Sequence, residues 1–256
     1  MLAVLAPGQG SQTPGFLTPW LESQFASDLL SSWSNAINLD LKRLGTTADG
    51  DEIRDTANAQ PLLVAGGLVG AGALFAGDGS AISYFAGHSV GEITAAALAQ
   101  VFDGASAMKL VRARGLAMAQ AANGTETGMS AVLGGERDEV IGALTELGLT
   151  AANENGAGQI VAAGSLTALT KLAENPPAGA RVRPLAVSGA FHTSTMATAV
   201  TELALIAART EVKDAVQPVI SNKDGAVISE GREILDRIVG QVAGPVRWDL
   251  CMQTLA

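Results

Sequence analysis

Five residues, Gly-His-Ser-Val-Gly at positions 87–91, constrain the fold of this chain more than any other feature. An apolar run at 81–86 precedes them and a helical pattern at 93–101 follows. Gly-x-Ser-x-Gly between a strand and a helix is typical of a nucleophile elbow, where small neighbours let the serine hydroxyl stand out above a sheet. A plain structural turn is the alternative, because the pattern also arises by chance in glycine-rich loops.

Short apolar runs alternate with helical patterns along the rest of the chain. The runs at 2–6 and 218–220 are short enough for strands, and we expect the first to be buried on both faces. Residues 105–121 and 195–209 have helical spacing. Strands separated by helices of this length predict parallel crossover connections. The expected fold class is therefore α/β, with an α/β-hydrolase-like parallel sheet that carries the elbow.

The middle of the chain has a different order of elements. We expect strands at 130–133, 149–152, 159–163 and 181–187, helices at 137–147 and 165–174, and a turn at 153–156. This β-α-β-β-α-β order is typical of ferredoxin-like folds. It predicts a small ferredoxin-like subdomain at 125–188, inserted into a large catalytic domain formed by 1–124 and 189–256.

Composition and charge exclude several classes of protein. With 48% hydrophobic and 16% charged residues, the 256-residue chain is globular rather than disordered. A net charge of −9 argues against nucleic-acid binding. Two histidines and one cysteine, Cys251, cannot form a Cys/His zinc site or an internal disulfide. We therefore expect no metal and a cytoplasmic location, with Cys251 a buried apolar residue rather than a second nucleophile.

One stretch is long enough to cross a membrane. Residues 56–77 carry no charge, but five glycines interrupt them and no basic cluster flanks them. We interpret the stretch as a buried helix that begins near Pro61 and packs closely through Gly66 and Gly70. The apolar start at 1–6 is too short for a signal peptide. The sequence therefore predicts a soluble protein.

A nucleophilic serine needs a general base, and the chain offers two histidines. His88 adjoins Ser89 in a tight turn, where successive side chains diverge. His192 is the better candidate, since it lies on a loop just before a helix, although a structural histidine is the alternative. The helix that begins at the elbow directs free amides toward Ser89, so the Val90 amide is the natural first oxyanion donor.

Arg114 lies on the inward face of its predicted helix. Its neighbours at three and four residues' distance are all apolar: Leu110, Val111, Ala117 and Met118. A buried guanidinium is costly unless an anion meets it, and its planar fork can hold a carboxylate with two hydrogen bonds. The residues alone leave three possibilities equally open: a substrate carboxylate, an internal Asp or Glu partner, or a side chain that reaches solvent.

Several motifs together carry a family resemblance. They are Pro-Gly-Gln-Gly-Ser-Gln at 7–12, Gln-Pro at 60–61, Gly-His-Ser-Val-Gly-Glu at 87–92, Arg-Gly at 114–115, Asn-Glu-Asn at 153–155 and Ala-Phe-His at 190–192. In this order, along the whole chain, they resemble the malonyl-CoA:acyl carrier protein transacylases. This acyltransferase family is shared with the loading domains of fatty-acid and polyketide synthases. Its members continue past the equivalent of 248–256 with another strand and a helix.

The resemblance implies a role for each matching residue. Ser89 would accept the acyl group and His192 would be its base. Gln9 would give its amide as the second oxyanion donor beside Val90. Arg114 would hold the malonyl carboxylate, and the main-chain carbonyl of Gln241 would orient His192. The resemblance also suggests that Asn155 lines the pocket.

The expected reaction is a ping-pong transfer of malonyl from malonyl-CoA, through a malonyl-Ser89 intermediate, to the phosphopantetheine thiol of acyl carrier protein for fatty-acid synthesis. No cofactor is expected to be permanently bound, and the expected partners are malonyl-CoA, CoA and acyl carrier protein. With Phe191 before the histidine, the Ala-Phe-His motif at 190–192 resembles that of malonyl-selective members. An acidic carrier protein would need a basic patch on this acidic chain, for which Arg181, Arg183 and Lys171 are conceivable members, with ordinary solvated surface as the alternative.

Three other functions remain open. A serine hydrolase or thioesterase would use the same elbow with water as acceptor, but would gain nothing from an inward Arg114. A stand-alone polyketide-type acyltransferase would take another acyl-CoA. A non-catalytic binding protein could keep the fold, although Ser89 and His192 argue against it.

Overall fold

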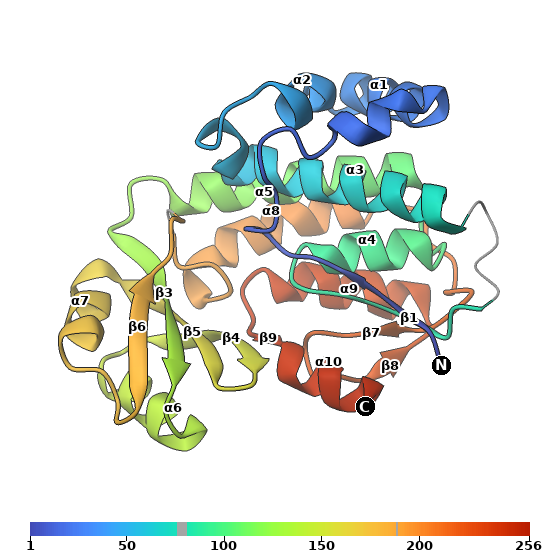
Figure 1. Ribbon diagram of the computed structural model, residues 1–256. Coiled ribbons are helices and arrows are strands. Elements are labelled where there is room, and N and C mark those ends of the chain that lie inside the picture. The colour runs from blue at the N-terminus through green and yellow to red at the C-terminus, as the bar shows by residue number, and fades with distance from the viewer. Residues whose placement is uncertain (76–80, 188) are drawn as a thin grey trace.

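The computed structural model describes residues 1–75, 81–187 and 189–256. These residues form a mixed α/β fold with two sheets (Figure 1). Its strands are β1 (Ala3–Ala6), β2 (Tyr84–Gly87), β3 (Thr127–Gly134), β4 (Thr150–Gly156), β5 (Gln159–Ser165), β6 (Ala180–Pro184), β7 (Val219–Ile220), β8 (Val227–Ile228) and β9 (Val246–Arg247).

Helices cover both sheets. They are α1 (Gln24–Ile37), α2 (Leu41–Thr46), α3 (Thr56–Phe75), α4 (Gly91–Leu98), α5 (Gly104–Ala122), α6 (Arg137–Glu146), α7 (Leu166–Glu174), α8 (Ala197–Ala207), α9 (Gly231–Gln241) and α10 (Trp248–Leu255). Short 3₁₀ helices span Thr18–Glu22, Glu52–Arg54 and Ser194–Met196.

The first sheet has the strand order β1-β2-β7-β8, with β1, β2 and β7 parallel and β8 antiparallel to β7. Helix α4 packs on β1 and β2, with α3 and α5 layered beyond it, while α10 lies on the opposite side of the sheet (Figure 1). The expectation that 2–6 is buried on both faces is wrong. Because β1 is the edge strand, Leu5 remains 45% exposed. Strand β2 begins at Tyr84, three residues later than expected.

Helix α3 begins at Thr56 rather than near Pro61, so the proline lies inside it. A proline there cannot donate to the carbonyl four residues earlier, which is that of Ala57. The Arg112 guanidinium donates to this carbonyl instead, at 2.7 Å. The helix is long and apolar enough to cross a membrane, but half of its most apolar stretch is buried in the fold, where Gly66 packs against Phe16. Residues 76–77 of the charge-free stretch lie outside the described residues.

The second sheet has the order β6-β3-β5-β4-β9 and is antiparallel except for the β4–β9 pair. Along the chain, its elements β3, α6, β4, β5, α7 and β6 follow the expected β-α-β-β-α-β order. Helices α6 and α7 pack on one face of the sheet over a separate hydrophobic core. Ser165 caps α7 as its sequence predicts, by accepting the Ala168 N–H. Position 188, the expected end of the subdomain, lies outside the described residues.

The expected turn at 153–156 is wrong. Asn153 and Glu154 belong to β4, because they pair with β5 on one side and with β9 on the other. The chain turns at Ala157 and Gly158, both with positive φ. Strand β6 also ends earlier than expected, at Pro184, so that Leu185 and Val187 leave the sheet and line a cavity.

Several predicted helix ends are also corrected. Helix α4 ends at Leu98 rather than at residue 101, because Gln100 takes a positive φ and breaks the helical path. Helix α8 spans Ala197–Ala207, inside the expected 195–209, and a 3₁₀ turn precedes it. Helix α5 matches its predicted range to within one residue at each end.

Candidate active site

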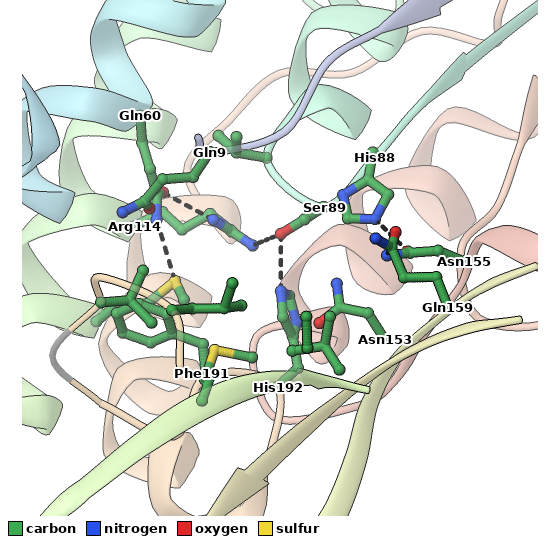
Figure 2. A pocket seen from close by; sticks show the side chains of 17 residues that line it. Gln9, Gln60, His88, Ser89, Arg114, Asn153, Asn155, Gln159, Phe191 and His192 are labelled. Atoms are coloured by element: carbon green, nitrogen blue, oxygen red, sulfur yellow. Dashed lines mark hydrogen bonds between the residues drawn. The ribbon is translucent and has the colours of Figure 1, made fainter. Parts of the chain in front are cut away.

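A cavity of about 260 Å³ lies between the elbow and the second sheet (Figure 2). The elbow contributes Ser89 and Val90, and the buried helices contribute Gln60 and Arg114. Strands β3, β4 and β5 contribute the opposite wall. The cavity thus brings together residues that are far apart in the sequence.

Ser89 occupies the strained position of the elbow, with a φ of 51°. A non-glycine residue rarely adopts this left-handed conformation. The flanking glycines make it sterically possible, because a Cβ on Gly87 would overlap the Gly91 carbonyl and one on Gly91 would overlap the Ala6 carbonyl. The two glycines of the motif therefore allow strand β2, the turn and helix α4 to pack this closely.

His192 is the histidine that contacts the serine. Its Nε2 lies 2.7 Å from Ser89 Oγ, and its Nδ1 lies 2.8 Å from the main-chain carbonyl of Gln241 (Figure 2 shows the serine contact). Because a carbonyl can only accept, Nδ1 carries the proton in the neutral ring and Nε2 has the free lone pair. Burial, with the nearby charge of Arg114, lowers the pKa of His192 to about 3. His192 is therefore neutral and ready to accept the hydroxyl proton.

His88 points away from the serine hydroxyl (Figure 2). Its Nε2 lies 2.8 Å from Asn155 Oδ1, and its ring meets Trp248 edge-on at 5.6 Å between centroids. Burial lowers the pKa of His88. Asn155 lies on the cavity wall, as the family resemblance suggests. It also donates to Gln159 Oε1 at 2.9 Å, and its contact with Nε2 fixes the His88 ring.

Arg114 is 1% exposed and is held by two glutamine side chains. It donates to Gln60 Oε1 at 2.7 Å and to Gln241 Oε1 at 2.9 Å, and its NH2 lies 3.3 Å from Ser89 Oγ. In ranges 1–75, 81–187 and 189–256 no carboxylate lies within 4.0 Å of the guanidinium, and its buried Nε has no partner. A direct ion pair and a solvent-reaching side chain therefore do not describe this arginine. The acidic group that acts on it is Glu92, through Gln241, whose side chain accepts from Arg114 and donates to Glu92.

Gln9 and Val90 lie together at the cavity. Val90 is the residue before helix α4, and the Gln9 side chain donates to Thr56 Oγ1 at 3.2 Å. Within the described part of the chain, neither main-chain N–H donates to a protein acceptor. Two main-chain amides without a protein acceptor, on residues that line the same cavity as Ser89, suit the binding of a developing oxyanion.

Three buried residues that the sequence analysis did not single out support the elbow: Glu92, Asn222 and the Gln241 side chain. Asn222 Oδ1 accepts the Ser89 N–H at 2.8 Å, and its own N–H donates to Glu92 at 2.6 Å. Gln241 Nε2, with two N–H groups, lies within hydrogen-bond distance of three acceptors: the Ser89 carbonyl, Asn222 Oδ1 and the Glu92 carboxyl. Burial raises the pKa of Glu92 to about 8. This network fixes the strained serine and the carbonyl that holds His192 in one unit.

Asn222 could have been found from the sequence. It follows the predicted strand at 218–220, and the carboxyl ends of neighbouring parallel strands meet at one edge of a sheet, where sites form. Gln60 gave a weaker signal, as a polar residue within a charge-free apolar helix. The side-chain role of Gln241 had no local signal.

Comparisons with known proteins show which proteins this chain resembles. Residues 5–239 match the acyl transferase domain family. The malonyl CoA-acyl carrier protein transacylase of Mycobacterium tuberculosis (strain H37Rv) is 52% identical over 260 residues, which cover 100% of this chain and 85% of the relative. A crystal structure of MCAT from the same species superposes with a TM-score of 0.94 at 51% identity, covering 99% of this chain and 84% of the other.

A further similar structure includes a carrier protein. It is a holo complex of a type II PKS acyl-carrier protein with its malonyl-transacylase, with a TM-score of 0.91 at 30% identity. The match covers 99% of this chain and 83% of that one.

Proposed function

Because the chain belongs to the acyl transferase family and matches malonyl CoA-acyl carrier protein transacylases along its whole length, we propose that it transfers malonyl through a covalent ester on Ser89. The chain is an acyltransferase that moves malonyl between coenzyme A and acyl carrier protein. The route through Ser89, and the role of each residue below, are our proposals. One observation carries them: a buried arginine with no carboxylate partner in the described residues lies 3.3 Å from a serine that contacts a neutral histidine.

In the first half-reaction, His192 Nε2 accepts the Ser89 proton while Oγ forms a bond to the thioester carbon. The main-chain amides of Gln9 and Val90 donate to the oxyanion of the tetrahedral intermediate. The carbon–sulfur bond then breaks, and the CoA sulfur takes the proton from His192. The main-chain carbonyl of Gln241 accepts from Nδ1 throughout and stabilises the imidazolium.

The second half-reaction runs in the opposite sense. The phosphopantetheine thiol of the carrier gives its proton to His192 and its sulfur bonds to the malonyl carbon. The ester bond to Ser89 breaks, and Oγ takes the proton back. The reacting groups come from the protein and the two thiols, so we propose that no resident cofactor takes part.

Arg114 selects malonyl in this proposal, since its guanidinium can hold the free carboxylate beside Ser89. The same contact would strengthen the base. The charge of Arg114 helps to lower the pKa of His192, and a bound carboxylate would offset that charge. A substrate with a carboxylate would thus be both held and activated.

Replacing Arg114 with alanine is expected to reduce kcat/KM for malonyl-CoA by ~10- to 10²-fold, because a charge-assisted contact of about 1.5–3 kcal/mol is lost. Transfer from acetyl-CoA should fall much less. The measurement is the rate of acyl transfer to holo-carrier from each acyl-CoA, with free acid release followed in parallel.

Lys109→Ala, an exposed change on the same helix, is the control and should leave both rates unchanged. An Arg114→Ala enzyme that keeps its preference for malonyl over acetyl would show that this arginine does not select the substrate. Release of free malonate at the rate of transfer would instead identify a hydrolase.

The pKa of His192 predicts an unusual pH profile. Burial keeps the histidine neutral down to about pH 3, so kcat/KM for acylation should not fall through the ordinary histidine range near 6.5. We expect a flat profile between about pH 5 and pH 7.5. Malonyl-pantetheine is the substrate of choice, because its arm carries no phosphate that titrates in this range. An acid limb centred near 6.5 would mean that the free enzyme does not bury His192 as described.

We propose further that the fold consists of an α/β-hydrolase-like catalytic domain, 1–124 and 189–256, with a ferredoxin-like subdomain at 125–188. The elbow at the end of β2 supports the first assignment, and the strand order β6-β3-β5-β4 supports the second. We also propose a cytoplasmic location, which agrees with a free, buried Cys251.

A further inference from the structure

One face of the second sheet forms a wall of the active-site cavity. Ala131 of β3 and Val161 of β5 are directly paired and both line the cavity. On its other side, Ala131 pairs with Arg183 of the edge strand β6. Directly paired residues on neighbouring strands point to the same face of a sheet. Arg183 therefore projects from the cavity-lining face.

Arg181 lies in the next row of the same face. It pairs with Leu133, and Leu133 pairs with the cavity residue Gln159. The alternation along β6 gives an independent check, because Val182, between the two arginines, packs into the core under α6 and α7 on the opposite face. Lys171 is on α7 and so belongs to that opposite side.

The two arginines are exposed, and no carboxylate of the described residues lies within 4.0 Å of them. Five other arginines do pair with carboxylates: Arg43, Arg54, Arg137, Arg237 and Arg247. Arg112, Arg114, Arg209 and Arg232 also lack such a partner among the described residues. What distinguishes Arg181 and Arg183 is that two exposed guanidinium groups extend from the same face of one edge strand, with Cα atoms about 7 Å apart, in a chain of net charge −9. Guanidinium forks suit phosphate oxygens particularly well.

The position of the pair matches the length of the substrate arm. The row Asn153–Val161–Ala131–Arg183 crosses three strand spacings, ~14 Å, and begins on the cavity wall. A pantetheine arm has about thirteen bonds between its sulfur and its phosphate, comparable to four extended residues or ~15 Å. Leu185 and Val187, which follow β6, line the same cavity. A thioester at Ser89 can thus extend its arm along this face to the edge strand.

We propose that Arg181 and Arg183 bind the phosphate at the end of the pantetheine arm, which malonyl-CoA and the holo-carrier share. This inference rests on the proposed thioester chemistry at Ser89. The arginines touch no reacting atom, so they act on the binding of both thiol substrates rather than on acyl transfer itself.

The test compares the double variant R181Q/R183Q with wild type on three substrates. For malonyl-CoA and for holo-carrier we expect KM to rise roughly tenfold, with little change in kcat, because the contacts are charge-assisted but partly screened by solvent. Malonyl-pantetheine, which lacks the phosphate, should acylate both enzymes at the same rate. R209Q removes an exposed arginine that follows α8 and should leave all three rates unchanged.

Each other outcome overturns the proposal. An increase in KM for the carrier alone would assign the arginines to the acidic protein surface of the carrier rather than to phosphate. Unchanged KM values, or an equal loss with malonyl-pantetheine, would remove the phosphate contact altogether. Failure of the wild-type enzyme to form an acyl adduct would instead contradict the chemistry at Ser89, independently of the two arginines.

Discussion

Replacing Ser89 with alanine is expected to reduce malonyl transfer by at least ~10⁴-fold, because the variant has no oxygen to carry the acyl group. Alanine keeps the Cβ and removes one atom, so the elbow and the Asn222 contact to the main chain remain. The measurement is the steady-state rate of malonyl transfer to holo-carrier.

The control is Ser31→Ala on helix α1, where the hydroxyl donates only to the Ser27 carbonyl of its own helix. It should transfer malonyl at the wild-type rate. Substantial activity of Ser89→Ala would mean that another group accepts the malonyl or that the thiol attacks malonyl-CoA directly. The one thiol, Cys251, is a poor candidate, since burial raises its pKa to about 12.

Replacing His192 with alanine should reduce the acylation rate by ~10²–10⁴-fold, the usual contribution of a positioned general base. The binding of malonyl-CoA should change little, because Arg114 and its two glutamine partners remain. A single-turnover measurement of CoA release separates the two effects. Imidazole added to the variant should restore part of the rate.

A His192→Ala enzyme with near-normal acylation would leave His88 as the proton acceptor, which its contact with Asn155 opposes. Thermal unfolding of the variant provides the necessary check on folding, because His192 is a buried residue in the left-handed region, with a φ of 61°.

Three candidate site residues, Ser89, His192 and Arg114, could be predicted from local pattern and chemistry. The elbow at Ser89 follows from five residues between a strand and a helix. His192 followed by elimination, and the apolar neighbours of Arg114 placed it on an inward face. The family resemblance added Gln9 and the Gln241 carbonyl, neither of which has a local pattern that predicts its place.

What could not be predicted depends on contacts between distant segments. The acceptor for the Ser89 N–H is 133 residues away in Asn222. The β4 segment at Asn153 resembles a turn in composition, but pairing with β5 and β9 overrides that preference. Likewise Pro61 is tolerated inside α3 because Arg112, from α5, satisfies the carbonyl that the proline leaves free. Tertiary contacts decide all three cases.

The central claim is that malonyl rests on Ser89 between two separate half-reactions. Intact-protein mass spectrometry after brief incubation with malonyl-CoA, without carrier, tests it most directly. We predict one malonyl adduct on the wild type, weak labelling by acetyl-CoA, none on Ser89→Ala, and loss of the adduct to holo-carrier when it is added. No adduct on an enzyme that nevertheless transfers malonyl when both substrates are present would contradict the claim and require direct transfer from one thiol to the other.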